Sequence, residues 1–219
     1  MRAMRTYAFN TLTSALLAQI VTLRHEPSVP EIWDELGRKE LSEADRAAVG
    51  AVTAKLLYYR TQRVNEATIW ARAIYPLLML AERGTIRAWS MVSLSATFND
   101  IELRGDADGA LAPSIDEEVG LPYLIVMEAK RGTSGTDPMA QLLGAMLCAA
   151  RQNEDGGHPT PEVFGCYTIA DVWTFVRARF DWAQPRPAMS LTVSREYTEK
   201  TEAGMILAIL AAIVAKYPT

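Results

Sequence analysis

The spacing of apolar residues changes along the chain, and its first part has the period of helices. Residues 9–23 carry apolar side chains three and four positions apart before two prolines, which predicts a helix. Ser42, with an acid three positions on, begins a second amphipathic helix that continues to residue 59. Asn65 is the expected N-cap of a third, longer helix, which Pro76 should bend. The first third of the chain is therefore predicted to be helical.

The period shortens to that of strands after residue 85. Residues 86–98 and 101–111 predict two strands with a turn at Asn99 between them. An acidic connection at 113–120 leads to a third strand at 121–130. This strand contains the run Leu-Ile-Val-Met, which is apolar on both faces, as in a central strand buried on both sides.

Helices and strands alternate in the remainder. Pro138 fits the first turn of a helix that runs to about residue 149. Residues 163–170 and 172–180 predict two strands around a turn, and residues 201–216 predict the last helix. The order of elements indicates the α/β class, with helices flanking a central sheet.

No repeat, low-complexity tract or linker divides the sequence. One domain over 1–219 is the economical interpretation, with a helical N-terminal segment (1–60) before the core (61–219). The net charge is −4, so the whole chain does not attract phosphate backbones. Binding of nucleic acid would require a local basic surface, a metal ion or a basic partner.

The cysteines and the apolar segments bear on location. Cys148 and Cys166 have no metal-ligand or disulfide spacing and fit buried positions, which favours a reducing cytoplasm. The N-terminal segment lacks the features of a signal peptide. The most apolar stretch, residues 204–215, is too short to cross a bilayer core of ~30 Å and is expected to be a core helix.

Charged residues at the C-terminal end of the central strand suggest a site. Glu128 and Lys130 are two positions apart, so an extended strand places both side chains on one face. The preceding strand carries Asp106 and Asp108, which are expected to share one face, and either carboxylate could approach Glu128. Carboxylates this close repel unless a cation lies between them, and Mg²⁺ (or Mn²⁺) is the natural candidate.

This pattern resembles the PD-(D/E)XK nuclease superfamily, which has the restriction-endonuclease-like fold. The matching segments are Gly-Asp-Ala-Asp-Gly-Ala-Leu at 105–111 and Leu-Ile-Val-Met-Glu-Ala-Lys-Arg at 124–131. Asp108 is similar to the family's metal-binding aspartate because it stands three residues after a glycine. Glu128 is similar to the second metal ligand, and Lys130 to the family lysine.

The resemblance covers roughly residues 60 to 215 and implies two further residues. Gln141, eleven residues after the lysine, resembles a glutamine that helps to position the lysine or contacts substrate. Glu66 resembles the glutamate of the family's first helix and is an additional candidate metal ligand. The sequence departs from the family name in one respect, because Ala107 stands where the proline is expected.

Other chemistries find less support in the sequence. His25 and His158 lie in proline-containing loops and pair with no nucleophile, which argues against a histidine-based hydrolase. The loop at 132–136 lacks the Gly-Lys-Ser/Thr ending of a P-loop. The expected function is a Mg²⁺-dependent nuclease that hydrolyses phosphodiester bonds, with DNA the expected substrate.

The rival prediction keeps the fold without the activity. It is a catalytically inactive nuclease-fold protein that acts as a binding subunit of a DNA defence or repair assembly. Cleavage of both strands of a duplex with one site per chain would favour a homodimer or a larger assembly.

Overall fold

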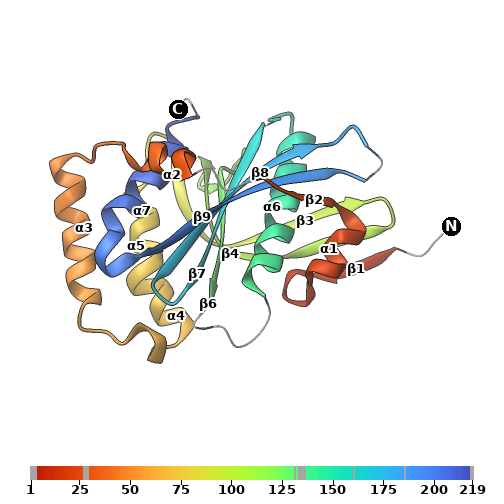
Figure 1. Ribbon diagram of the computed structural model, residues 1–219. Helices are drawn as coiled ribbons and strands as arrows, with labels where there is room; N and C mark the ends of the chain where they lie inside the picture. Colours follow the sequence, from red (N-terminus) through yellow and green to blue (C-terminus); the bar gives the residue numbers. More distant parts are fainter. Residues whose placement is uncertain are drawn as a thin grey trace.

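The computed structural model describes residues 4–26, 30–130, 132, 137–159, 161–184 and 186–217 (Figure 1). Within this part of the chain, nine strands form one mixed sheet with helices on both faces, which confirms the α/β class. The strands are β1 (Arg5–Ala8), β2 (Thr22–His25), β3 (Ile86–Phe98), β4 (Ile101–Ile115), β5 (Glu118–Val119), β6 (Ile125–Lys130), β7 (Glu162–Ile169), β8 (Val172–Asp181) and β9 (Ala188–Thr198). The helices are α1 (Ser14–Ile20), α2 (Pro30–Gly37), α3 (Glu43–Leu56), α4 (Glu66–Ile69), α5 (Tyr75–Leu80), α6 (Pro138–Asp155) and α7 (Glu199–Val214), with the short 3-10 turns η1 (Phe9–Thr11) and η2 (Thr61–Arg63) and the π-helix η3 (Trp70–Ile74).

The order of strands across the sheet is β1-β4-β6-β7-β8-β9-β2, and β3 and β5 also pair with β4. The β3–β4, β4–β6, β7–β8 and β8–β9 pairs are antiparallel, whereas β6 and β7 are parallel. Helix α6 connects the two parallel strands, as such a crossover requires. The first turn of α6 therefore lies at the end of the sheet where β6 finishes.

The N-terminal segment differs from its prediction as a purely helical extension. It supplies α1 to α3, but also two edge strands: β1 pairs in parallel with β4, and β2 pairs in parallel with β9. Each strand has only four residues, mostly exposed, so neither shows an alternating pattern in the sequence. The helix expected over 9–23 is correspondingly short, and its C-cap Val21 is already extended.

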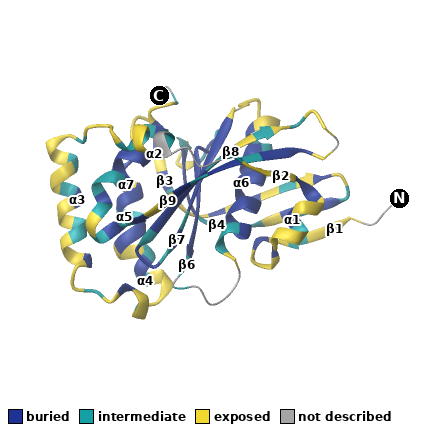
Figure 2. Ribbon diagram, viewed as in Figure 1, coloured by how far each residue is buried: buried dark blue, intermediate teal, exposed yellow. Residues whose placement is uncertain are grey.

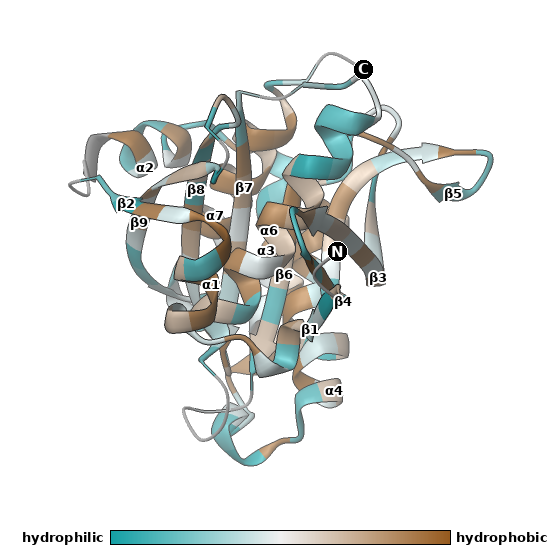
Figure 3. Ribbon diagram, turned by 90° about the vertical axis from the view of Figure 1, so that its right-hand side faces the viewer, coloured by the Kyte–Doolittle hydropathy of each residue, from teal (hydrophilic) through white to brown (hydrophobic). Residues whose placement is uncertain are grey.

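Three further elements, β5, β9 and α2, differ from the prediction, and β4 extends past its predicted end. Strand β9 and helix α2 occupy segments that the sequence pattern had left as connections. Strand β4 runs through the acidic stretch to Ile115, and Asp116 and Glu117 then adopt positive φ in the turn to β5. Figure 3 shows this hairpin projecting from the right-hand side of the upper part of the molecule, while α4 lies in its lower part.

Several local signals are confirmed. Strand β3 has the predicted bounds, and Asn99 adopts the positive φ of the expected turn. The side chains of Ser42 and Asn65 cap α3 and α4 by accepting from backbone N–H groups. The bend expected from Pro76 takes a specific form, because the π-helix η3 precedes it. Proline lacks an N–H donor, and the wider π turn accommodates the interruption within a continuous helix.

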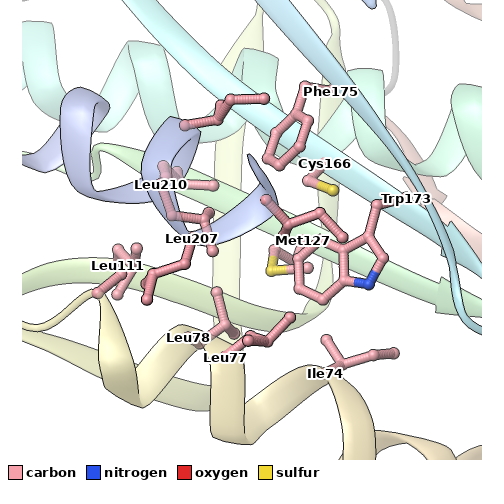
Figure 4. Close-up of a cluster of buried hydrophobic side chains, with 14 of the residues drawn as sticks. Ile74, Leu77, Leu78, Leu111, Met127, Cys166, Trp173, Phe175, Leu207 and Leu210 are labelled. Carbon is pink, nitrogen blue, oxygen red and sulfur yellow. The ribbon is translucent and has the colours of Figure 1, made fainter. Parts of the chain in front are cut away.

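The core fills both faces of the sheet. On one face, α5 and α7 pack against β6, β7 and β8 (Figure 4), and on the other α1 and α6 cover β4 and β6. The residues at 124–127 are fully buried, as predicted for a strand covered on both sides. Figure 2 shows the same central strands as buried, with α3 largely exposed at the periphery. No described helix is long and apolar enough to cross a membrane.

Leu77 offers a test of this packing. It is fully buried between α5 and the sheet, whereas Met79 on the same helix is 45% exposed. Leu77→Ala is expected to lower the free energy of unfolding by about 2–5 kcal/mol through lost burial and a cavity, and Met79→Ala by less than about 1 kcal/mol. Urea denaturation measures both values. Similar losses for the two variants would contradict the assignment of α5 to the core.

Candidate functional site

Asp108 and Glu128 meet where β4 separates from β6. The two strands pair only over Gly109↔Met127, Ala110↔Val126 and Leu111↔Ile125. One further step in this register would join Asp108 to Glu128. Instead, the earlier part of β4 pairs with β1, so the two strands part at these acidic residues.

Where the two strands part, the Asp108 carboxylate accepts the hydrogen bond that a backbone carbonyl of β4 would otherwise accept from β6. Its Oδ2 accepts from the backbone N–H of Ala129 at 2.6 Å. Burial raises the pKa of Asp108, and the negative charge of Glu66 adds to this, while the Ala129 N–H and the charge of Lys130 oppose it. The aspartate is thereby fixed against β6 at the mouth of the site.

Glu128 is the most deeply buried acid of the site, with 4% of its surface exposed. Its Oε1 lies 2.5 Å from the Lys130 Nζ. Burial raises the pKa of Glu128 to about 7; the charges of Asp108 and Glu66 add to this effect, and the hydrogen bond from Lys130 opposes it. A buried carboxylate whose pKa is raised further by neighbouring carboxylates marks an environment that favours a cation.

Lys130 supplies positive charge beside these acids. Burial lowers its pKa, but the hydrogen bond and charge of Glu128, together with the charges of Asp108 and Glu66, outweigh burial and raise it. The side chain is about a quarter exposed, so the ammonium can still reach an incoming anion. Lys130 therefore remains a cation at neutral pH.

Glu66 is brought over the site by the packing of its helix. Trp70, four residues later and thus on the same helical face, packs against Gly109 and donates from Nε1 to the Ser90 hydroxyl at 3.1 Å. A Cβ at position 109 would lie 2.4 Å from the Trp70 ring, so the close approach requires glycine. A pocket of about 280 Å³ results, lined by Glu66, Ala67, Trp70, Ser90, Met91, Asp108 and Ala129.

Gln141 lies in the first turn of α6, at the end of the sheet where β6 finishes. Its side chain is buried, and its Oε1 has no hydrogen-bond partner in the part of the chain that the structure describes. The structure joins it directly to neither Glu128 nor Lys130.

The structure separates the two aspartates of β4, which were expected to share one face. Asp106 is exposed and accepts from the Ser93 hydroxyl at 2.6 Å, whereas Asp108 contacts β6. The burial pattern explains this. Ala107 and Ala110 are three positions apart and would point to opposite faces of a regular strand, yet both pack in the same hydrophobic cluster. The alternation of side chains between the two faces is therefore interrupted between these residues. On β3, Met91 beside this step adopts positive φ.

A divalent ion at this site would be held by two carboxylates rather than by a larger set. The described residues contain no group of three or more His, Cys, Asp or Glu side chains placed to hold a metal. The structure therefore does not bring Glu66 into a ready three-ligand set with Asp108 and Glu128. Mg²⁺ commonly takes one or two protein carboxylates and completes its shell with water and phosphate oxygens, so the pair suffices.

A second polar cluster, which the sequence interpretation missed, adjoins the site. The Ala170 N–H donates to the Lys130 carbonyl at 2.7 Å, and the next residue, Asp171, accepts from the Thr61 hydroxyl at 2.5 Å. Lys200 forms an ion pair with Asp171 at 3.6 Å. Only a turn was expected at Asp171, because its partners come from segments distant in sequence. Arg131 and the residues at 133–136 lie outside the described residues.

Glu199 is the most deeply buried member of this cluster. It is fully inaccessible, its Oε2 accepts from the Trp173 Nε1 at 2.8 Å, and its Oε1 has no partner among the described residues. Burial raises the pKa of Glu199 to about 7; the charge of Asp171 adds to this, while the hydrogen bond from Trp173 opposes it.

Comparison of the sequence with known protein families finds no family that matches, and comparison with characterised proteins finds no similar sequence.

A substitution at Gly109 tests whether the contact between Trp70 and Gly109 holds helix α4 over the site. Gly109→Ala is expected to displace Trp70 and lower the free energy of unfolding by about 1–3 kcal/mol, because the added methyl group overlaps the ring. Gly50→Ala in α3 is the control: no atom lies within 4 Å of its Cβ position, so the change should stabilise the helix by up to ~1 kcal/mol. Urea denaturation followed by tryptophan fluorescence measures both. A neutral Gly109→Ala variant would contradict the tight packing.

Glu199 predicts a pH dependence of stability. Its folded-state pKa of about 7 lies above the ordinary value of 4.5, so its contribution to stability is fully present below about 4.5 and is lost as the pH rises through about 7. Glu199→Gln should remove this loss, and its stability relative to wild type should increase over that interval. Thermal unfolding at a series of pH values measures the difference.

Glu202 is the control with the opposite sign. Burial opposes the shift, but hydrogen bonds from Arg195 and the Thr198 N–H lower the pKa of Glu202. The contribution of Glu202 to stability is present above its ordinary pKa of 4.5 and is lost as the pH falls through the lowered pKa. Glu202→Gln should therefore become less stable relative to wild type as the pH rises. If both variants follow the same trend, the assignment to Glu199 is wrong.

Proposed function

We propose that this protein is a Mg²⁺-dependent nuclease that hydrolyses phosphodiester bonds of DNA. The observation that carries the proposal is the convergence of Asp108, Glu128 and Lys130 at the point where β4 and β6 separate. Two carboxylates and an ammonium group in a half-buried recess supply what phosphodiester hydrolysis needs: ligands for a divalent ion and a positive charge for the phosphate.

The arrangement of the elements supports membership in the PD-(D/E)XK superfamily. The helical stretch α4–α5 is followed by β3, β4 and β6, then by α6 and β7, in a mixed sheet flanked by helices. The residues that resemble the family motif lie on adjacent strands of this unit. The restriction-endonuclease-like fold is accordingly the interpretation we favour for residues 61–219.

Each residue has a distinct role in the proposal. Asp108 and Glu128 would hold Mg²⁺ or Mn²⁺, which supplies Lewis acidity toward the phosphate and a water of lowered pKa. Lys130, now paired with Glu128, would donate to a phosphate oxygen and stabilise the charge that develops there. Gln141 would orient the lysine through its free acceptor, and Glu66 would act at the rim of the pocket.

One observation favours the alternative, a catalytically inactive binding subunit of a DNA defence or repair assembly. The Lys130–Glu128 ion pair satisfies the most buried acid without a metal, and the described residues hold no preformed three-ligand cluster. In such a protein the same charges would stabilise the fold. A homodimer or larger assembly is compatible with both functions.

Cleavage assays with matched variants distinguish the two functions. Purified protein would be incubated with linear, circular and single-stranded DNA in the presence of Mg²⁺ or Mn²⁺. Asp108→Asn, Glu128→Gln and Lys130→Ala should each lower the cleavage rate by about 100-fold or more, because each removes a charge from the site. Asp106→Asn is the control and should keep wild-type activity, since its side chain points to Ser93.

Three outcomes of these cleavage assays would change the assignment. Equal activity in the wild type and all three site variants would identify a contaminating nuclease and overturn the proposal. Loss of activity in Asp106→Asn but not in Asp108→Asn would move the metal ligand to Asp106. DNA binding without cleavage under every metal condition would favour the inactive binding subunit.

A further inference from the structure

The segment from 46 to 81 has a charge opposite to that of the whole chain. It contains five cationic residues and one acid, Glu66, in a protein whose net charge is −4. All five cations are exposed, and Arg46, at the start of α3, donates to the Leu41 carbonyl. The other four are Lys55, Arg60, Arg63 and Arg72. Together with Tyr58 they form what we call the Tyr58 surface. This is the local basic surface that binding of nucleic acid by an acidic chain requires.

The charge of this surface is not neutralised by ion pairs within the part of the chain that the structure describes. None of these four cations forms an ion pair with a described residue, whereas exposed arginines elsewhere do so, such as Arg195 with Glu202. Unpaired cations at neighbouring positions repel one another. A polyanion that lies across them would relieve this repulsion and release its own counterions.

Aromatic rings accompany the cations. The Tyr58 side chain is 91% exposed, and the guanidinium of Arg72 lies 5.0 Å from the centre of the Tyr59 ring. Beside them is a pocket of about 570 Å³, lined by Val52, Lys55, Leu56, Tyr58, Tyr59, Ala71, Arg72 and Pro76. An exposed ring next to cations is a combination on which unpaired bases stack, because every base presents a flat π face.

The Tyr58 surface is linked to the candidate site through hydrogen bonds of the residues next to it. The Lys200 Nζ donates to the Tyr59 carbonyl at 2.9 Å, and the Thr61 hydroxyl donates to Asp171. The residue before Asp171 hydrogen-bonds the Lys130 carbonyl. The segment then continues through η2 into α4, which carries Glu66. Figure 1 shows the connection from α3 to α4 at the same lower end of the molecule as the end of β6.

We propose that the Tyr58 surface binds a single-stranded segment of the DNA substrate beside the candidate site. Lys55, Arg60, Arg63 and Arg72 engage its phosphates, and the Tyr58 ring stacks on an unpaired base. A duplex fits less well, because its bases expose only their edges while their faces are stacked. The identity of the polymer rests on the proposed function, whereas binding itself requires neither cleavage nor a metal ion.

The test measures binding without metal. Fluorescence anisotropy of a fluorescein-labelled 20-nucleotide thymidine strand, and of the same strand in a duplex with its complement, would be recorded in EDTA over a range of salt concentrations. The wild type should bind the single strand at least tenfold more tightly than the duplex. The slope of log K against log salt should be about −2.8, since each phosphate contact of a single strand contributes about −0.7.

Variants assign the contributions. Arg60→Ala combined with Arg63→Ala should weaken binding at least tenfold and reduce the magnitude of the slope by about 1.4. Tyr58→Ala should weaken binding about tenfold without changing the slope, and Tyr58→Phe should restore it because the ring is kept. Arg24→Ala on β2, an exposed cation outside this surface, is the matched control and should bind as the wild type does. Circular dichroism verifies that each variant is folded.

The outcomes separate this inference from the proposed function. Absence of single-strand binding, tighter binding of the duplex, or equal weakening by Arg24→Ala would overturn the inference even if the protein cleaves DNA. Single-strand binding that depends on Tyr58 and the two arginines supports it. If such binding occurs but no cleavage follows addition of Mg²⁺, the inference is retained and the nuclease assignment is wrong.

Discussion

A buried backbone donor must find an acceptor, and this constraint shapes the whole candidate site. Strand β6 is covered on both faces, so its N–H groups have no access to water. Alternate residues of β6 bond toward β7, and the others, including Ala129, are directed toward β4. Beyond Gly109, β4 no longer supplies carbonyl groups to β6, and the Asp108 carboxylate takes their place. One polar side chain thus both completes the sheet and carries charge into the site.

The sequence predicts those features that depend on neighbours along the chain. The bounds of β3, the caps at Ser42 and Asn65 and the doubly buried strand follow from local spacing and composition. Strands β1 and β2 do not, because four-residue edge strands are defined by their pairing with β4 and β9. The same holds for Asp171, whose partners come from η2 and α7.

The candidate site shows the same division. The Glu-x-Lys spacing places Glu128 and Lys130 together, as expected for a strand. The choice between Asp106 and Asp108 depends on an interruption of alternation in β4 that the sequence pattern does not reveal. Likewise, the path of α4 over Asp108 depends on contact between Trp70 and Gly109, which are 39 positions apart in sequence.

The π-helix η3 has a consequence for how the two halves of this helical stretch are oriented. A π turn contains about one residue more than an α turn, so the part before it is rotated by roughly 100° relative to a continuous α-helix. Leu77 and Leu78 can then face the core while Glu66 and Trp70 face the pocket. The extra residue of the π turn thus sets the angle between the helix face that packs in the core and the helix face that lines the charged pocket.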